Sequence, residues 1–198
     1  MSLKLAIEDP VQNDTPSGFT LGEVADIISV AVFRELGPLV AAIVLTGFAG
    51  ASIAAELGTM VVSEEIEALE ASAIPPIRFL VVPRVLATTV MMICLAVVGD
   101  LVGMCGGMLV SRFFLGIGLL QYVTHTFDVV KLQDFVTGLI KAGVFGTLIS
   151  GMACFLGLNV TGGAQGVGNA TTRTVVLTIV ALITVDLMFT SVFYYLGW

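Results

Sequence analysis

The chain has little charge and only one histidine. Charged residues make up 12% of its 198 residues, whereas a typical soluble domain carries about 25%. The sequence has neither a two-histidine metal pattern nor a Ser/His/Asp set, and it contains no Walker motif. Its net charge of -7 argues against nucleic acid, which selects basic surfaces. We therefore expect no enzyme activity, no metal site and no cofactor bound by this chain itself.

Long uncharged segments make up most of the remaining sequence. Hydrophobic residues form 57% of the chain, and the mean hydropathy is +1.06. A helix needs about 20 apolar residues to cross a bilayer. We therefore predict an all-α integral membrane protein with about four transmembrane helices. The predicted spans are residues 38–56, 85–111, 135–158 and 174–198.

The residues before the first span divide into two parts. Residues 1–20 are polar and contain two prolines, so we expect a mobile tail outside the membrane domain of residues 21–198. Residues 21–34 have helical periodicity but are too short and too charged to span. We predict a short interfacial helix here. It should end near Gly37 and Pro38, because proline disfavours helical geometry in the preceding residue.

An acidic segment separates the first two predicted spans. Four glutamates crowd into seven residues: Glu64, Glu65, Glu67 and Glu70. Three apolar residues share one helical face: Ile66, Leu69 and Ala73. We predict a helix from Ser63, whose hydroxyl would cap it, to Ile74. A helix lying on an anionic leaflet would carry lysine and arginine, so we expect this one to bind a soluble partner in the cytoplasm.

Four ionisable residues fall at membrane depth in this scheme: Glu56, Asp100, Lys141 and Asp186. Each costs at least about 2.5–3.5 kcal/mol at mid-bilayer, so each should face a partner or a wet cavity. Lys141 and Asp186 would meet if their helices are antiparallel neighbours. A structural ion pair is one interpretation of such a contact, and a role in gating or lipid handling is the other.

Small residues recur at four-residue spacing in two predicted spans, which favours close helix packing. The two stripes are Gly99, Gly103 and Gly107, and Ala142, Gly146, Ser150 and Cys154. The three cysteines lie in apolar runs without metal-ligand spacing, so we expect them in the core. Residues 159–169 are polar and rich in glycine, and we predict a flexible loop there.

Five short motifs follow one another along the chain. They are Arg-Glu-Leu-Gly-Pro at 34–38, Ala-Ala-Glu-Leu-Gly-Thr-Met at 54–60, Glu-Glu-Ile-Glu-Ala-Leu at 64–69, Val-Pro-Arg at 82–84 and Gly-Val-Gly-Asn-Ala-Thr-Thr-Arg-Thr-Val-Val at 166–176. Together they resemble the MlaE (YrbE) permease family, the membrane subunits of Mce-type lipid ABC transporters. The motif positions singled out are Arg34, Glu35, Gly37, Pro38, Gly58 and Arg84.

The resemblance implies a multi-pass homodimer in the inner membrane. It would move phospholipid or a related lipid between that membrane and a periplasmic Mce-domain (MlaD-like) partner. A separate cytoplasmic ATPase subunit would bind ATP. The helix between the first two predicted spans would couple to that ATPase through Glu65, Ile66, Leu69, Glu70 and Ala73.

Two departures from the family pattern and one alternative function stay open. Family members usually have a further span before the Arg-Glu-Leu-Gly-Pro motif and an arginine where this chain has Phe48. The alternative is an ion- or proton-coupled secondary transporter that uses Glu56, Asp100 and Asp186.

Small residues in the first span favour a dimer contact there. They are Gly47, Gly50, Ala51, Ala54 and Ala55.

Overall fold

The computed structural model describes residues 32–110, 112–113, 122–124, 126 and 132–195. Four helices in this part are long and apolar enough to cross a membrane. They are Arg34–Val62, Ile77–Val110, Gln133–Leu158 and Gly163–Phe193. The prediction of an all-α protein with four spans is therefore confirmed. The predicted tail and all but the last three residues of the predicted interfacial helix lie outside the described residues.

The first span is one continuous helix, built from η1 (Val32–Leu36), α2 (Gly37–Leu45), η2 (Thr46–Gly50) and α3 (Ala51–Val62). The predicted break near Gly37 and Pro38 is therefore wrong. The segment η1 is a π-helix, and Pro38 follows it in the first turn of α2. The wider π turn and the first-turn position both accommodate a residue that lacks an N–H, so the helix passes through the proline.

The second span repeats this arrangement. The π-helix η3 (Ile77–Val81) leads into α5 (Val82–Val110), and Pro83 is the second residue of α5. The span therefore begins at Ile77 rather than at residue 85. Arg84 consequently lies inside a membrane helix, in the first turn of α5.

The third and fourth spans are α7 (Leu132–Leu158) and α8 (Gly163–Tyr195). The predicted third span lies within α7. The predicted glycine loop is wrong beyond residue 162, because α8 already begins at Gly163. Gly162 and Gly163 have φ values of +92° and +67°, a backbone region that glycine enters without steric cost. These two residues turn the chain sharply, and the glycines that follow are helical.

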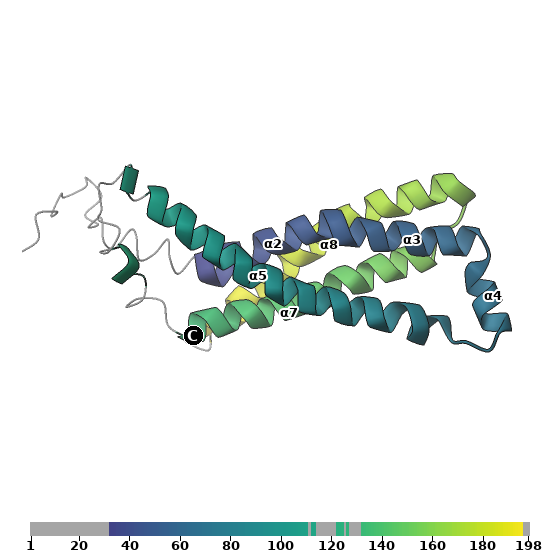
Figure 1. The fold of residues 1–198 in the computed structure, drawn as a ribbon, viewed down its shortest axis with the longest axis horizontal. Coiled ribbons are helices and arrows are strands. Elements are labelled where there is room, and N and C mark those ends of the chain that lie inside the picture. The colour runs from purple at the N-terminus through teal and green to yellow at the C-terminus, as the bar shows by residue number, and fades with distance from the viewer. Residues whose placement is uncertain (1–31, 111, 114–121, 125, 127–131, 196–198) are drawn as a thin grey trace, which may run out of the picture.

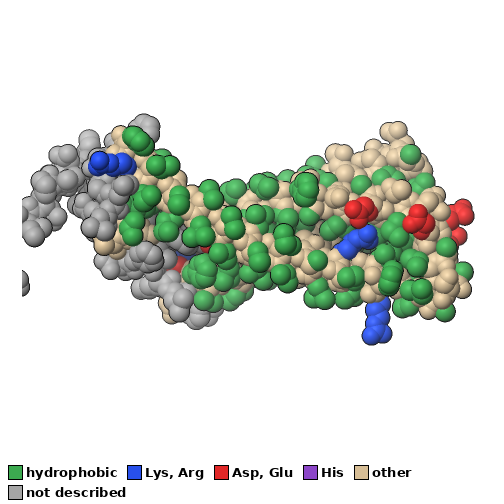
Figure 2. Space-filling model, viewed as in Figure 1, with side chains coloured by type: hydrophobic (Ala, Val, Ile, Leu, Met, Phe, Trp, Pro, Cys, Tyr) green, Lys and Arg blue, Asp and Glu red, His purple; other side chains and the backbone are tan. Residues whose placement is uncertain are grey.

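The four spans run along the long axis of the molecule, and the short helix α4 (Glu65–Ala71) lies across one end (Figure 1). We call this the α4 end; it also holds the start of η3 and the turn at 159–162. The far end holds η1, the end of α5, the start of α7 and the end of α8. Successive spans are antiparallel, and α7 contacts each of the other three. Hydrophobic side chains cover the visible face between the two ends (Figure 2).

Small side chains allow this close packing. The predicted stripe on α7 is buried along its whole length, from Ala142 to Cys154. A Cβ at Gly146 would lie 2.7 Å from the Cα atom of Thr89, so α5 and α7 approach too closely for any larger residue. The expectation for cysteine is correct for Cys154 and wrong for Cys94 and Cys105, which are exposed.

Candidate functional site

Lys141 is the centre of a buried charge network at the far end. Its side chain is 1% exposed, and its Nζ atom lies 2.6 Å from Glu35 Oε2, 3.1 Å from Asp186 Oδ1 and 3.1 Å from Thr190 Oγ1. An ammonium group has three donor hydrogens, so these contacts use all of them. The network joins η1, α7 and α8, three segments that are far apart in the sequence.

The predicted ion pair between Lys141 and Asp186 is thus present, but Glu35 was not expected to join it. The sequence pattern placed Glu35 after the predicted interfacial helix of residues 21–34 and before the first span, where an exposed carboxylate would be unremarkable. Thr190 completes the network, since its hydroxyl lies 3.2 Å from both Glu35 carboxylate oxygens. The sequence did contain a signal for this contact: Glu35 directly precedes an uncharged segment long enough to span the membrane.

A second ion pair lies beside this network. Arg34 Nη1 is 3.4 Å from Asp134 Oδ1, and Asp134 lies in the first turn of α7, the helix that also carries Lys141. Adjacent residues of η1 therefore bind two residues of α7, which fixes η1 against the bundle. Within these contacts three carboxylates face two cations, so this set of five residues carries a formal charge of about -1.

Asp100 is buried separately on α5. Its residue is 3% exposed, and its Oδ1 atom has no hydrogen-bond partner among the residues that the structure describes. Met92, Ala96 and Asp100 recur every four residues on the buried face of α5. A buried acceptor without a partner costs about 1–3 kcal/mol. Among the carboxylates predicted at membrane depth, Asp100 is thus the one that forms no ion pair with the described residues.

Glu56 lies at the other end of the molecule. Its Oε2 atom accepts a hydrogen bond of 3.0 Å from Arg84 Nη2, which joins α3 to α5. Gly58 follows on α3, and a Cβ there would lie 2.9 Å from Val160 Cγ2. Glycine at this position therefore allows α3 to pack against the turn between α7 and α8.

The helix α4 is shorter than predicted, because both of its ends differ from the predicted ones. Glu64 and Ala73 have φ values of 61° and 60°, so the chain turns sharply before and after the helix. Ser63 does not cap α4. Its hydroxyl instead donates to Thr59 O at 3.0 Å and terminates α3. Ala73 lies beyond the last helical residue, so it is not part of the predicted apolar stripe.

The remaining pattern of α4 agrees with the sequence. Ile66 and Leu69 are half-buried, and all four glutamates are exposed. Acidic side chains gather on the visible surface at this end of the molecule (Figure 2). This segment therefore presents exposed carboxylates beside two half-buried apolar residues.

The C-terminal turn of α4 gives the first testable prediction. Ile74 N–H donates to Leu69 O at 3.0 Å and Ala73 N–H donates to Glu70 O at 2.9 Å, the Schellman pattern in which glycine normally occupies the position of Ala73. We expect Ala73→Gly to stabilise this turn by about 1 kcal/mol. Hydrogen exchange at residues 73 and 74 should slow about fivefold. Ala71→Gly, inside the helix, should have the opposite effect, and equal exchange in both variants would contradict the prediction.

An apolar groove runs between α2 and α5. Its volume is about 420 Å³, and its lining contains no charged residue. The lining residues are Leu36, Gly37, Val40, Ala41, Val44, Leu95, Val98, Gly99, Val102 and Gly103. Two of the three glycines of the α5 stripe thus line a groove. The groove begins beside η1, directly after Glu35 in the sequence.

Comparison with known proteins identifies close similarity over most of the chain. The sequence model of a family described as Permease MlaE matches residues 19–192. A probable ABC transporter permease protein of Rickettsia felis is 40% identical over 171 residues, which is 86% of this chain and 66% of that protein. A probable ABC transporter permease protein of Synechocystis is 38% identical over 159 residues, covering 80% and 60%.

A plant protein is also similar. The chloroplastic protein TRIGALACTOSYLDIACYLGLYCEROL 1 of Arabidopsis thaliana is 36% identical over 171 residues, 86% of this chain and 49% of that protein. The chain therefore spans about half to two thirds of the length of these curated relatives.

Proposed function

Since the chain belongs to the MlaE permease family, we propose that it is the membrane subunit of an ABC transporter for phospholipid or a related lipid. The apolar groove between α2 and α5 is the observation that carries the lipid assignment. A groove of about 420 Å³ with an uncharged lining suits an acyl chain and offers nothing to a small polar solute. The name of the plant relative refers to a glycerolipid, which supports the same class of substrate.

The proposed transporter needs partners for energy and for delivery. The family assignment supports a separate ABC ATPase, which would bind ATP and contact α4 from the cytoplasm. A periplasmic Mce-domain protein would exchange lipid with the permease at the far end. In this arrangement α4 and the buried network lie on opposite sides of the inner membrane. Coupling between them would pass along α3, α7 and α8, which contact one another.

The alternative of a secondary transporter is less well supported by the geometry. Glu56 pairs with Arg84 and Asp186 pairs with Lys141. In both pairs a transported cation would first have to displace the arginine or lysine that the carboxylate already binds. Of the three carboxylates in that hypothesis, only Asp100 lacks an ion pair within the described part of the chain.

Reconstitution tests the proposed function. The chain and its proposed ATPase partner would be placed in liposomes that contain fluorescent phospholipid, with acceptor vesicles added. We expect lipid transfer that requires ATP and stops when the catalytic glutamate of the ATPase is replaced. Transfer that follows a proton gradient without ATP would instead support the secondary transporter.

The proposed homodimer predicts a pattern of cross-links on the first span. Gly50 and Ala54 contact α7 within the chain, through Ile149 and Gly157, so these two positions do not form the dimer face expected from the sequence. Phe48 is 80% exposed, and Val40 and Val44 are also exposed. In a cysteine-free background, we expect cysteine at one or more of positions 40, 44 and 48 to give covalent dimers.

Buried positions provide the control for this experiment. Cysteine at position 50 or 54 should give no dimer, because both residues already face α7. Cross-linking that is equal at exposed and buried positions would indicate random collision. A complete absence of cross-links along the span in nanodiscs would argue against a dimer through this face.

A further inference from the structure

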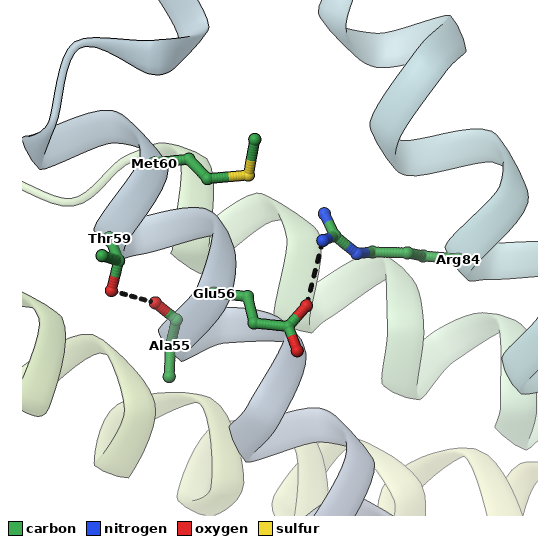
Figure 3. A pocket seen from close by; sticks show the side chains of 5 residues that line it. All are labelled: Ala55, Glu56, Thr59, Met60 and Arg84. Atoms are coloured by element: carbon green, nitrogen blue, oxygen red, sulfur yellow. Dashed lines mark hydrogen bonds and ion pairs between the residues drawn. The ribbon is translucent and has the colours of Figure 1, made fainter.

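The pocket at the α4 end contains a cation and an anion that are both incompletely bonded. It has a volume of about 420 Å³ and is lined by Ala55, Glu56, Thr59, Met60 and Arg84. Glu56 and Arg84 extend toward each other across it from α3 and α5 (Figure 3). None of these residues lines the apolar groove between α2 and α5, so this is a separate site.

The guanidinium of Arg84 has an unused donor. Nη2 binds Glu56 at 3.0 Å, but Nη1 is buried and has no hydrogen-bond partner among the described residues. A buried donor left without an acceptor costs about 1–3 kcal/mol. An arginine that lines a pocket with Nη1 unpaired can bind a phosphate oxygen there, because each guanidinium N–H is a charged donor.

The carboxylate of Glu56, on the α3 side of the pocket, can accept further hydrogen bonds. Its side chain is 59% exposed, and only Oε2 binds Arg84. The hydroxyl of Thr59 donates to Ala55 O at 2.8 Å, so its oxygen can still accept a hydrogen bond. These two oxygens would bind an ammonium group and repel a second negative charge.

We propose that this pocket binds the headgroup of a phospholipid that carries both a phosphate and a primary ammonium, as phosphatidylethanolamine does. The phosphate would bind Arg84, and the ammonium would bind Glu56 and the Thr59 hydroxyl. A quaternary ammonium has no N–H to donate, and a glycerol headgroup has no positive charge. The pocket therefore selects against phosphatidylcholine and phosphatidylglycerol. This inference rests on the proposed function, since it names the lipid class that such a permease would carry.

Binding can be measured without transport. The purified chain would be delipidated in detergent and incubated with equal amounts of dioleoyl phosphatidylethanolamine, phosphatidylglycerol and phosphatidylcholine, and bound lipid counted by native mass spectrometry. We expect phosphatidylethanolamine to exceed each of the others about tenfold, the difference that one charged hydrogen bond supplies. Glu56→Gln should remove this preference, and Arg84→Gln should weaken binding of all three lipids.

Matched variants separate binding from stability. Arg78→Gln removes the same charge from an exposed position on neighbouring η3, and it should leave lipid selectivity unchanged. If Arg84→Gln does not fold, Arg84→Lys keeps the charge and should still lose affinity, since lysine cannot bind phosphate and Glu56 through paired donors. A merely structural ion pair would change stability without changing which headgroup binds. An unchanged preference in Glu56→Gln would overturn the proposal.

Two further arms identify the ligand and separate this proposal from the proposed function. Saturable binding of glycerophosphoethanolamine, with no enrichment of the intact lipid, would show a site for a soluble phosphate ester and overturn the lipid assignment. ATP-driven transfer whose lipid selectivity is the same in wild type and Glu56→Gln would refute only this inference. Headgroup-selective binding without ATP-driven transfer of any lipid would support the pocket and refute the proposed transport function.

Discussion

Leu69→Asp is expected to abolish binding of the ATPase while the permease remains folded and inserted. Leu69 is half-buried in the centre of α4, and the exposed residues around it are mostly glutamates. An apolar residue surrounded by charges is typical of the centre of a docking surface, where truncation costs 2 kcal/mol or more. A carboxylate at this position would be desolvated without a partner on binding, which adds a further penalty.

Co-purification of the ATPase with each variant measures the effect. We expect at least a thirtyfold loss of association for Leu69→Asp, which corresponds to about 2 kcal/mol. Ala68→Asp is the matched control, because it adds the same charge one residue away at an exposed position. It should keep most of the ATPase. Elution of both variants at the wild-type volume in detergent would establish that neither is unfolded.

Replacing the surrounding glutamates should have smaller effects. Glu67→Gln and Glu70→Gln remove exposed charges at the rim of the surface, which mainly tune the association rate and its dependence on salt. We expect each to change binding a few-fold at low salt and less at high salt. Full retention of the ATPase by Leu69→Asp would show that coupling uses another surface, and the turn at residues 159–162 would be the next to test.

The helices were predictable to the extent that local sequence determines them. Four apolar segments of sufficient length predicted four spans, and the described part of the chain contains four. The errors are the helix break expected near Pro38 and the second span expected to begin at residue 85, which begins at Ile77 and includes Pro83. The rule that proline ends a helix assumes regular α geometry, and here each proline follows a five-residue π-helix. The π turns let the helices continue through the prolines, and a pattern of residue types does not reveal such turns.

The ends of α4 were unpredictable for a related reason. Glu64 and Ala73 occupy left-handed backbone conformations, which glycine usually provides. Nothing in either residue type indicates a turn. The sharp reversal after α7, in contrast, has two glycines at positive φ, yet the pattern of polar residues suggested a longer loop. Glycine content thus showed that a turn occurs there, but did not show that the helix resumes at Gly163.

The candidate site was only partly predictable. Lys141 and Asp186 are charges in otherwise apolar spans, so the cost of burial alone predicted that they would pair. Glu35 lay outside the predicted span and was assigned only to a motif. The groove between α2 and α5 depends on how far apart two helices lie. Hydrophobic periodicity gives no information about that separation, because lipid-facing and groove-lining residues are equally apolar.

Lys141→Met should be the most destabilising single change in the buried network. It removes the cation that both Glu35 and Asp186 contact, and it leaves two carboxylates close together without this shared partner. Breaking a buried ion pair by removing one partner costs about 3–5 kcal/mol. Asp186→Asn should cost less, because Lys141 keeps Glu35 at 2.6 Å and the remaining pair is neutral overall.

A double-mutant cycle tests this order of effects. Unfolding in detergent would be followed for Lys141→Met, Asp186→Asn and the two together, with the exposed Arg78→Gln as the control for loss of one positive charge. We expect the double variant to be more stable than Lys141→Met alone, because the second change removes one of the two unpaired carboxylates. Exchanging the two residues, with Asp at 141 and Lys at 186, should recover part of the loss. Additive single changes, with no coupling between positions 141 and 186, would mean that the contact contributes nothing to stability and that the network must be explained by its role in transport alone.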